Sequence, residues 1–417
     1  MIAVLLAAAL VLPAPNVTII GASKLYTQAE PGARLAGLQI VVSAGTARQS
    51  PSQGGLAALA AETIVQTPID GRSLFDRSAA AGGSIAYAIA PDRVRFTIEA
   101  LPDALPGIAR DLARAMRAPD TSAATLAAAR RNLGDRIADD ERNPVAVGLD
   151  MLRGSYFSGG AAQPLFGTRV ALANAAPADV AAFVAAHYRR GNAFATAIGN
   201  VDTGSEAAAR AILDALPDGA ESSAALTARP FAALNKRIVT HRDVGTPFVL
   251  LGFAAPALGE RDFAAMLVVR TILGEVAERR GATTPAAFER GVDVLYAYDL
   301  KPATLTLAIN GNQLDPSAGL TVVQTILRAA STRPFAPSVL ARYKATARGQ
   351  WQLEATSFAD RAWLIGAAVA HGADPAEAQA TVAAIDRVTA ADVLRMAKTY
   401  LQHYTIALVL PRSRANS

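Results

Sequence analysis

The chain has no cysteine, which excludes a disulfide framework, a thiolate metal site and a cysteine nucleophile. It has only four histidines, His187, His241, His371 and His403, and none lies within helical reach of another. We therefore interpret each as a surface or capping residue rather than a metal ligand. The chain also lacks the G-x-S-x-G, G-x-x-x-x-G-K and G-x-G-x-x-G motifs, so three common classes of catalytic or phosphate-binding loop have no sequence support.

Charge is scarce as well. Only 18% of the residues are charged, and the net charge of +5 comes from basic residues that are scattered along the chain. This distribution favours solubility and does not indicate a nucleic-acid-binding surface. Long uncharged hydrophobic runs are also missing, so we expect no membrane span.

The longest apolar run is at the N-terminus, where residues 2–12 read "IAVLLAAALVL". It is too short to cross a bilayer but has the length of a signal-peptide core, and small residues and prolines follow it. We expect residues 1–16 to be a signal or N-terminal apolar segment and the protein to be periplasmic or exported. Because no basic residue precedes the run, a truncated start or a buried first strand remains open, and so does a cytoplasmic location.

What the chain does contain is an internal repeat. Residues 176–201, "APADVAAFVAAHYRRGNAFATAIGNV", and 389–411, "TAADVLRMAKTYLQHYTIALVLP", each predict a helix with an aspartate near its start, then a turn, then a strand. Residues 79–101 and 289–312 each predict a strand, a proline-containing turn and an alternating strand, and a helix follows each pair. Agreement at two places indicates that one unit of roughly 200 residues is present twice.

The predicted organisation follows from this repeat. We expect a first repeat over residues 17–217, a polar Ala/Ser-rich linker over 218–236, and a second repeat over 237–417. Strand pairs alternate with long helices, so we predict an α+β fold in which each repeat is a largely antiparallel sheet with long helices on one face.

One predicted helix has an unusual composition. The stretch "GGLAALAAETIVQT", residues 54–67, follows the strand-like "LAGLQIVVSAG" and contains a single carboxylate, Glu62. The position of this stretch after a strand and its Gly-Leu-Ala start resemble the first long helix of the pitrilysin or insulinase family of zinc metallopeptidases, the inverzincins, in their short bacterial form. The resemblance extends from about residue 17 to 412 and implies that the two repeats form half of a clamshell chamber. Active members carry H-x-x-E-H on this helix, in which the histidines bind zinc, the glutamate is the general base, and a second glutamate on a later helix completes the site.

The resemblance also implies that this zinc site is degenerate. The first histidine position is Ala58, the catalytic glutamate position is Ala61, and the second histidine position is Glu62. Aligning "RRNLGDRIADDERNP" on Asn143-Pro144 places Arg136 at the last ligand. We therefore expect no catalytic residue, metal or cofactor in this chain, and an ion pair between Glu62 and Arg136 across the former site.

Two further positions correspond to substrate contacts in active members. In "GGSIAYAIAPDRVRF", Ala86 stands where an asparagine contacts the peptide, and the two glycines fit a tight entry to a strand. In "FERGVDVLYAY", Tyr296 matches a substrate-gripping tyrosine, while Glu289, next to Arg290, replaces the arginine that acts with it. Ordinary packing is the alternative interpretation of Tyr296.

These features imply a function. The chain resembles the metal-free subunit of mitochondrial processing peptidase, which pairs with a zinc subunit. We expect a non-catalytic subunit of a heterodimeric peptidase, which forms a chamber wall and contacts the peptide while a zinc-bearing homologue cleaves it. The alternatives are a structural or peptide-binding homodimer without an associated protease and, at lower odds, a hydrolase with a relocated site.

Overall fold

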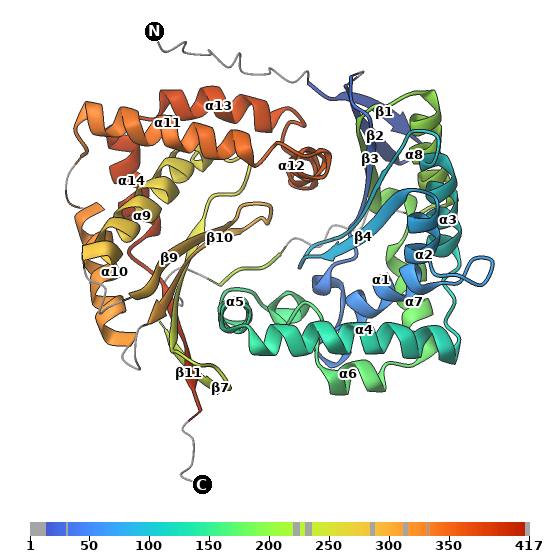
Figure 1. Cartoon of the computed structure of the whole chain (residues 1–417), viewed down its shortest axis with the longest axis horizontal. Coiled ribbons are helices and arrows are strands. Elements are labelled where there is room, and N and C mark those ends of the chain that lie inside the picture. The colour runs from blue at the N-terminus through green and yellow to red at the C-terminus, as the bar shows by residue number, and fades with distance from the viewer. Residues whose placement is uncertain are drawn as a thin grey trace.

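The computed structural model of the chain describes residues 14–30, 32–219, 226–229, 236–283, 288–311, 316–330, 332 and 334–412. These residues form two sheets that face each other, and most of the helices form a layer on the outer side of each sheet (Figure 1). Most of the expected signal segment, residues 1–13, lies outside the described residues, so that expectation stays a prediction.

The first sheet has six strands in the order β1-β2-β6-β3-β5-β4. Strands β2 and β6 are parallel and the other neighbours are antiparallel, and β4 is an edge strand. Buried and partly exposed residues alternate along β5, as expected for a strand with one face on a core. The strands are β1 (Asn16–Ile20), β2 (Ser23–Ala29), β3 (Ala36–Val42), β4 (Gly83–Ile89), β5 (Val94–Ala100) and β6 (Ala193–Gly199).

The helices of the first half begin with recognisable caps. Ser122 accepts a hydrogen bond from the Thr125 amide at the start of α4, and Asn143 does the same for Val145 at the start of α5. Because Asn143 both ends α4 and caps α5, and Pro144 opens α5, the two helices meet at a corner. The helices are α1 (Leu56–Gln66), α2 (Leu74–Ala80), α3 (Leu105–Arg117), α4 (Ala123–Arg142), α5 (Pro144–Tyr156), α6 (Arg169–Asn174), α7 (Pro177–His187) and α8 (Thr203–Ala215).

The second sheet repeats the topology of the first. Its order is β7-β11-β8-β10-β9, which corresponds to β2-β6-β3-β5-β4, and β7 and β11 are again the parallel pair. This correspondence confirms the predicted two-repeat α+β fold. The strands are β7 (Arg237–Arg242), β8 (Phe248–Ala255), β9 (Phe288–Ala297), β10 (Ala303–Gly311) and β11 (Thr405–Pro411).

The helices of the second half include the counterpart of α7. Asp179 in α7 accepts a hydrogen bond from the Ala176 amide at 2.7 Å, and Asp392 in α14 accepts one from the Thr389 amide at 3.0 Å. The aspartates that suggested two equivalent helix starts therefore have the same role. The helices are α9 (Phe263–Thr283), α10 (Pro316–Ala330), α11 (Pro337–Leu353), α12 (Phe358–Ala370), α13 (Glu377–Arg387) and α14 (Ala390–Tyr400).

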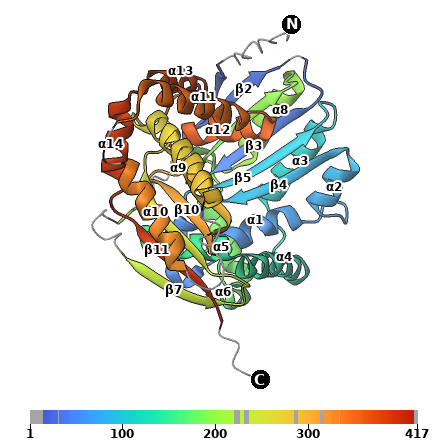
Figure 2. The ribbon, with the colours of Figure 1, turned by 60° about the vertical axis from the view of Figure 1, so that its left-hand side comes forward.

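Each half also covers the inner face of the other half's sheet with one helix (Figures 1 and 2). From the first half, α5 packs Val147 and Leu152 against the second sheet. From the second half, α12 packs Ala362 and Ile365 against the first sheet. The sequence predicted helices on one face only, and this exchange of α5 and α12 adds a helix to the other face of each sheet.

A glycine permits the close approach of α5. A Cβ atom at Gly148 would lie 2.4 Å from Leu250 Cδ1 on β8, far inside van der Waals contact. A larger residue at this position would require either the Leu250 side chain or α5 to shift.

The segment predicted as the linker, residues 218–236, is described only at 218–219, 226–229 and 236. In this part, Leu226 is buried in a cluster with Tyr156 and Phe157, and the Arg229 amide donates to the Tyr156 carbonyl at 2.8 Å. Residues 226–229 therefore pack against the end of α5.

Candidate functional site

The helix predicted to correspond to the zinc helix, α1, is buried on all sides. It starts at Gly55, whose φ of +89° favours glycine, and every residue from Leu56 to Val65 is buried. The methyl groups of Ala58 and Ala61 have no exposed surface and belong to the hydrophobic core of the first half. The two positions expected to correspond to a zinc ligand and to the general base are thus part of the packing.

Glu62 is the one charged residue on α1, and its side chain is 1% exposed. Its carboxylate accepts hydrogen bonds from the Tyr87 phenol on β4, from Asn132 Nδ2 on α4 at 2.8 Å and from Gln66 Nε2 at 3.0 Å. These three neutral donors satisfy a buried carboxylate that would otherwise be costly. We define Glu62, Gln66, Tyr87, Asn132 and Arg136 as the Glu62 cluster.

The predicted ion pair between Glu62 and Arg136 is present but long. Arg136 Nη2 lies 4.0 Å from Glu62 Oε2, and the Arg136 side chain is 39% exposed. The same guanidinium stacks on Tyr87, with Cζ 4.7 Å from the ring centroid, and lies 5.6 Å from the Phe166 ring. Arg136 thus closes the rim of the cluster, while the neutral donors, which the sequence did not indicate, make the short contacts.

The chemistry of the Glu62 cluster does not fit zinc. Burial and the nearby Glu62 charge raise the pKa of Tyr87 well above its ordinary value, so the phenol stays protonated and donates to the carboxylate. Zinc sites in proteins need three or four nitrogen, sulfur or carboxylate ligands. Within the described part of the chain, no group of three or more His, Cys, Asp or Glu side chains can hold a metal ion.

The second half contains a related cluster with the charges exchanged. Here the arginine, Arg270, is on the first long helix, α9, and the carboxylate, Glu354, follows α11. Arg270 Nη1 lies 2.5 Å from Glu354 Oε1, and the Tyr298 phenol donates to Glu354 Oε2. Both repeats thus join two helices through a carboxylate, an arginine and a tyrosine near β4 or β9.

Ala86 lies on the exposed inner face of β4. Its neighbours Ile85 and Tyr87 point into the helix-covered core, and the alternation of the strand turns Ala86 to the opposite face, where it is exposed. Because β4 is an edge strand of the first sheet, Ala86 is next to an open strand edge. Its contact with a peptide stays a prediction.

Tyr296 lies on β9, but its side chain packs toward the helix layer. Its ring centroid lies 5.8 Å from that of Phe263 on α9, and its hydroxyl donates to the Pro256 carbonyl. A contact with substrate would require this hydrogen bond to break. The side chain of Glu289, the predicted replacement of the partner arginine, lies outside the described residues.

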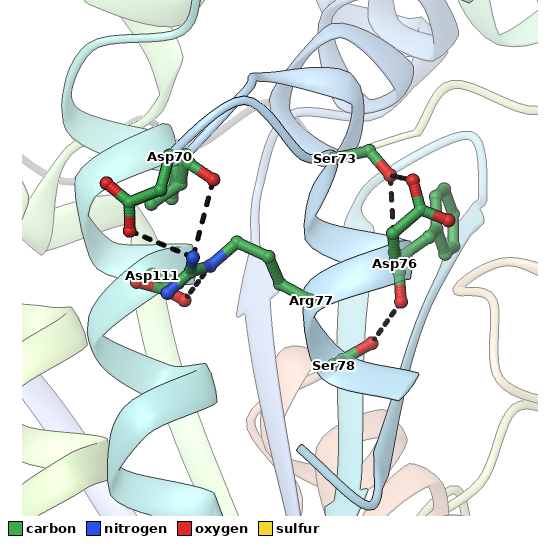
Figure 3. Close-up of polar contacts among 8 residues, drawn as sticks. Asp70, Ser73, Asp76, Arg77, Ser78 and Asp111 are labelled. Atoms are coloured by element: carbon green, nitrogen blue, oxygen red, sulfur yellow. Dashed lines mark hydrogen bonds and ion pairs between the residues drawn. The ribbon is translucent and has the colours of Figure 1, made fainter. Parts of the chain in front are cut away.

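A charged cluster next to β4 cross-links α2 to α3 (Figure 3). Arg77 on α2 donates to Asp111 on α3 at 2.7 Å and to Asp70 at 2.9 Å, and Ser73 caps α2 at the Asp76 amide. Arg77 pairs with both carboxylates, so these contacts connect α2 to α3 and support the helices beside β4.

The turns of the two equivalent hairpins meet between the sheets. Arg93 follows the β4–β5 turn, its side chain is 2% exposed, and its Nη2 lies 2.7 Å from Asp299 Oδ2 in the β9–β10 turn. Arg93 Nη1 lies 2.6 Å from Asp92, and His371 Nε2, at the end of α12, lies 3.7 Å from the same carboxylate. We call Asp92, Arg93, Asp299 and His371 the hairpin junction. Of the four histidines, His371 is thus a buried one with an interdomain contact.

One family model matches the chain. Residues 174–291 match the model described as the Peptidase M16 inactive domain. No curated protein matches the chain.

Solved structures are similar over nearly the whole chain. A protease from Helicobacter pylori has a TM-score of 0.85 at 14% identity, covering 96% of this chain and all of its own. The peptidase M16 inactive domain from Pseudomonas fluorescens has a TM-score of 0.82 at 16% identity, covering 95% of this chain and 98% of its own. An M16-like peptidase from Alicyclobacillus acidocaldarius has a TM-score of 0.76 at 14% identity, again covering 95% and 98%. At these identities the likeness establishes a shared fold.

None of the helices in the described part of the chain is both long and apolar enough to cross a bilayer.

Proposed function

We propose that this chain, which resembles the M16 peptidases in its matched segment and in its fold, is the non-catalytic subunit of a two-chain peptidase. In this role it forms one wall of the chamber and contacts the peptide, while a zinc-bearing homologue cleaves the bond. The M16 inactive-domain match supports a peptidase-like protein without catalytic activity of its own.

The Glu62 cluster is the observation that carries the proposal. The one residue at a ligand position that could hold a metal is buried under Tyr87, Asn132 and Gln66, and alanines fill the other two helix positions. The residues at the expected metal-site positions are thus used for packing and hydrogen bonds within the fold. A chain with such a site would contribute binding surface and stability to a complex, and the catalytic groups would come from its partner.

The inner face of the first sheet supports a role in peptide contact. Within the part of the chain that the structure describes, one edge of β4 has no strand partner, and Ala86 and Ser84 are exposed on its inner face. An extended peptide can add to such an edge through main-chain hydrogen bonds.

Co-expression with a zinc-bearing homologue tests the proposal. We expect a 1:1 heterodimer by size-exclusion chromatography with light scattering, with peptidase activity above that of the homologue alone. Two separate peaks, with full activity in the homologue's peak, would contradict the subunit role. A homodimer of this chain that binds peptide in the absence of the homologue would support the alternative, a peptide-binding or structural protein.

Tyr296→Phe in that heterodimer separates substrate contact from packing. A phenol that stabilises the developing charge at the cleaved bond would make kcat fall by about 10²–10³ on its removal. If the hydroxyl only donates a hydrogen bond to the Pro256 carbonyl, kcat stays constant and the free energy of unfolding falls by about 1 kcal/mol.

A further inference from the structure

Arg95 is a cation on the inner face of the first sheet, and the Glu62 cluster and the hairpin junction do not use it. It lies on β5, where its neighbours Val94 and Phe96 point into the core of the first half. The strand alternation therefore turns Arg95 toward the second half. Its direct neighbour on the edge strand β4 is Ala88, two residues from Ala86.

Arg95 is partly buried and has no hydrogen bond or ion pair with any residue that the structure describes. Arg95 contacts the indole of Trp363 on α12, whose ring centroid lies 5.6 Å from Arg95 Cζ. Trp363 in turn packs on Tyr298, with ring centroids 5.2 Å apart. An aromatic pair of the second half thus lies beside the guanidinium of Arg95, with the Trp363 indole next to it.

The charge of Arg95 is poorly compensated. Burial and the nearby Arg93 charge lower its pKa to about 10, although Asp299 and Asp92 act in the opposite direction. Both of these carboxylates already bind Arg93, at 2.7 and 2.6 Å. The nearest anions are therefore committed to another cation.

The guanidinium of Arg95 can still be reached. Arg93, Arg190 and Arg361 each have an Nε that is fully buried without a partner, whereas no nitrogen of Arg95 is in this state. Its unpartnered nitrogens thus keep some exposed surface.

We propose that Arg95, held against Trp363, binds a carboxylate of a peptide that lies on the inner face of the first sheet. A guanidinium presents parallel N–H donors that match a carboxylate, and a partly desolvated site strengthens such a bond. The inference rests on the proposed peptide-binding role and adds a preference for a group of defined chemistry. The carboxylate is either the C-terminus of the peptide or an Asp or Glu side chain.

Binding of short fluorescein-labelled peptides to the full chain tests the preference. One pair of peptides differs only by a free or amidated C-terminus, and a second pair, both amidated, differs only by Glu or Gln at an internal position. We expect Kd to be at least about tenfold lower for the acid member of one pair, and the pair that discriminates identifies the source of the carboxylate. Arg95→Gln should abolish the discrimination and Arg95→Lys should retain part of it. Arg110→Gln, an exposed arginine on α3 in the outer layer, is the matched control and should retain all of it.

A second measurement does not depend on peptide binding. The chain has two tryptophans, and the indole N–H of Trp351 donates to the Ala378 carbonyl, which makes it an internal reference. Titration with N-acetylglycine, followed by ¹H–¹⁵N NMR, should shift the Trp363 indole signal, while N-acetylglycinamide should not. Trp363→Phe assigns the signal.

The outcomes separate the two proposals. If peptides bind but neither pair discriminates and Arg95→Gln has no effect, the carboxylate site is wrong and peptide binding stands. If no peptide binds but N-acetylglycine shifts Trp363 in an Arg95-dependent way, the site stands and the peptide role fails. If neither occurs, both are wrong.

Discussion

Arg93 of the first repeat and Asp299 of the second form a buried ion pair between equivalent hairpin turns, and Arg93 Nη2 also donates to the Asp299 carbonyl at 2.6 Å. A single guanidinium thus binds both the side chain and the backbone of the opposite turn. The two halves are joined at the centre of the molecule by a polar contact as well as by the exchanged helices.

Removing one partner of this pair should destabilise the chain strongly. Arg93→Leu leaves two carboxylates, Asp299 and Asp92, without their cation, and a broken buried pair costs about 3–5 kcal/mol. Chemical denaturation followed by circular dichroism measures the change. Arg142→Leu, which removes an exposed pair with Asp139, is the control and should cost less than about 1 kcal/mol. Equal losses in the two variants would show that the hairpin junction does not hold the halves together.

Asp92 should make stability fall in acid. Burial disfavours its charged form, but Arg93 and His371 outweigh burial, so the pKa of Asp92 lies below its ordinary value of 3.8. A carboxyl group with a lowered pKa in the folded state stabilises the fold above its unfolded pKa, and this contribution is lost as the pH falls through the folded pKa. We expect the free energy of unfolding to decrease below about pH 4.

Asp92→Asn isolates that contribution. It should lower stability at neutral pH and make the acid dependence less steep, as measured by urea unfolding at a series of pH values. Asp103→Asn, at an exposed carboxylate, controls for the loss of one negative charge. An unchanged acid dependence in Asp92→Asn would assign the effect to other groups.

Tyr87→Phe tests the Glu62 cluster. The substitution keeps the ring that stacks on Arg136 and removes only the hydroxyl that donates to Glu62. Leaving a buried carboxylate oxygen without that donor should lower the free energy of unfolding by about 1–3 kcal/mol. Tyr343→Phe removes a hydroxyl from another buried tyrosine, one that has no hydrogen bond with any residue that the structure describes, and should have a smaller effect. An unchanged free energy of unfolding in Tyr87→Phe would mean that the hydrogen bonds from Asn132 and Gln66 are enough to stabilise the Glu62 carboxylate.

Restoring the zinc motif should not restore zinc binding. The variant Ala58→His, Ala61→Glu, Glu62→His, Arg136→Glu places larger side chains at two positions that have no exposed surface. Overpacking of this kind typically costs about 1–3 kcal/mol per site. Elemental analysis should find no stoichiometric zinc in the native chain, nor in this variant, whose Tm should be lower. One zinc per variant chain would show that the site can reopen, and one zinc per native chain with chelator-sensitive proteolysis would overturn the non-catalytic role.

The sequence predicted the repeated elements because their signals are local. Turn residues such as Pro91 and Pro302, and aspartates such as Asp179 and Asp392, act within a few residues, so equivalent hairpins and helix starts could be recognised in both repeats. The duplicated unit explains why the two sheets share one strand order and one parallel pair, β2–β6 and β7–β11.

The contents of the candidate site were harder to predict because they depend on long-range contacts. The sequence indicated Arg136 as the partner of Glu62 through its charge and its aligned position. The donors Tyr87 and Asn132 are 25 and 70 residues from Glu62 in the chain, and a neutral phenol or amide has no charge pattern that would reveal the contact. The pair of Arg93 and Asp299 was missed because the two residues are 206 positions apart in the chain.

The exchange of α5 and α12 also constrains how this architecture can be assembled. An isolated repeat would expose the apolar inner face of its sheet to water, and its own exchanged helix would have no surface to cover. A single repeat should therefore be stable only as a pair of copies that trade this helix with each other, as in a domain-swapped dimer. In the present chain both copies lie on one polypeptide, so each half acts as the folding partner of the other and the two are expected to unfold together.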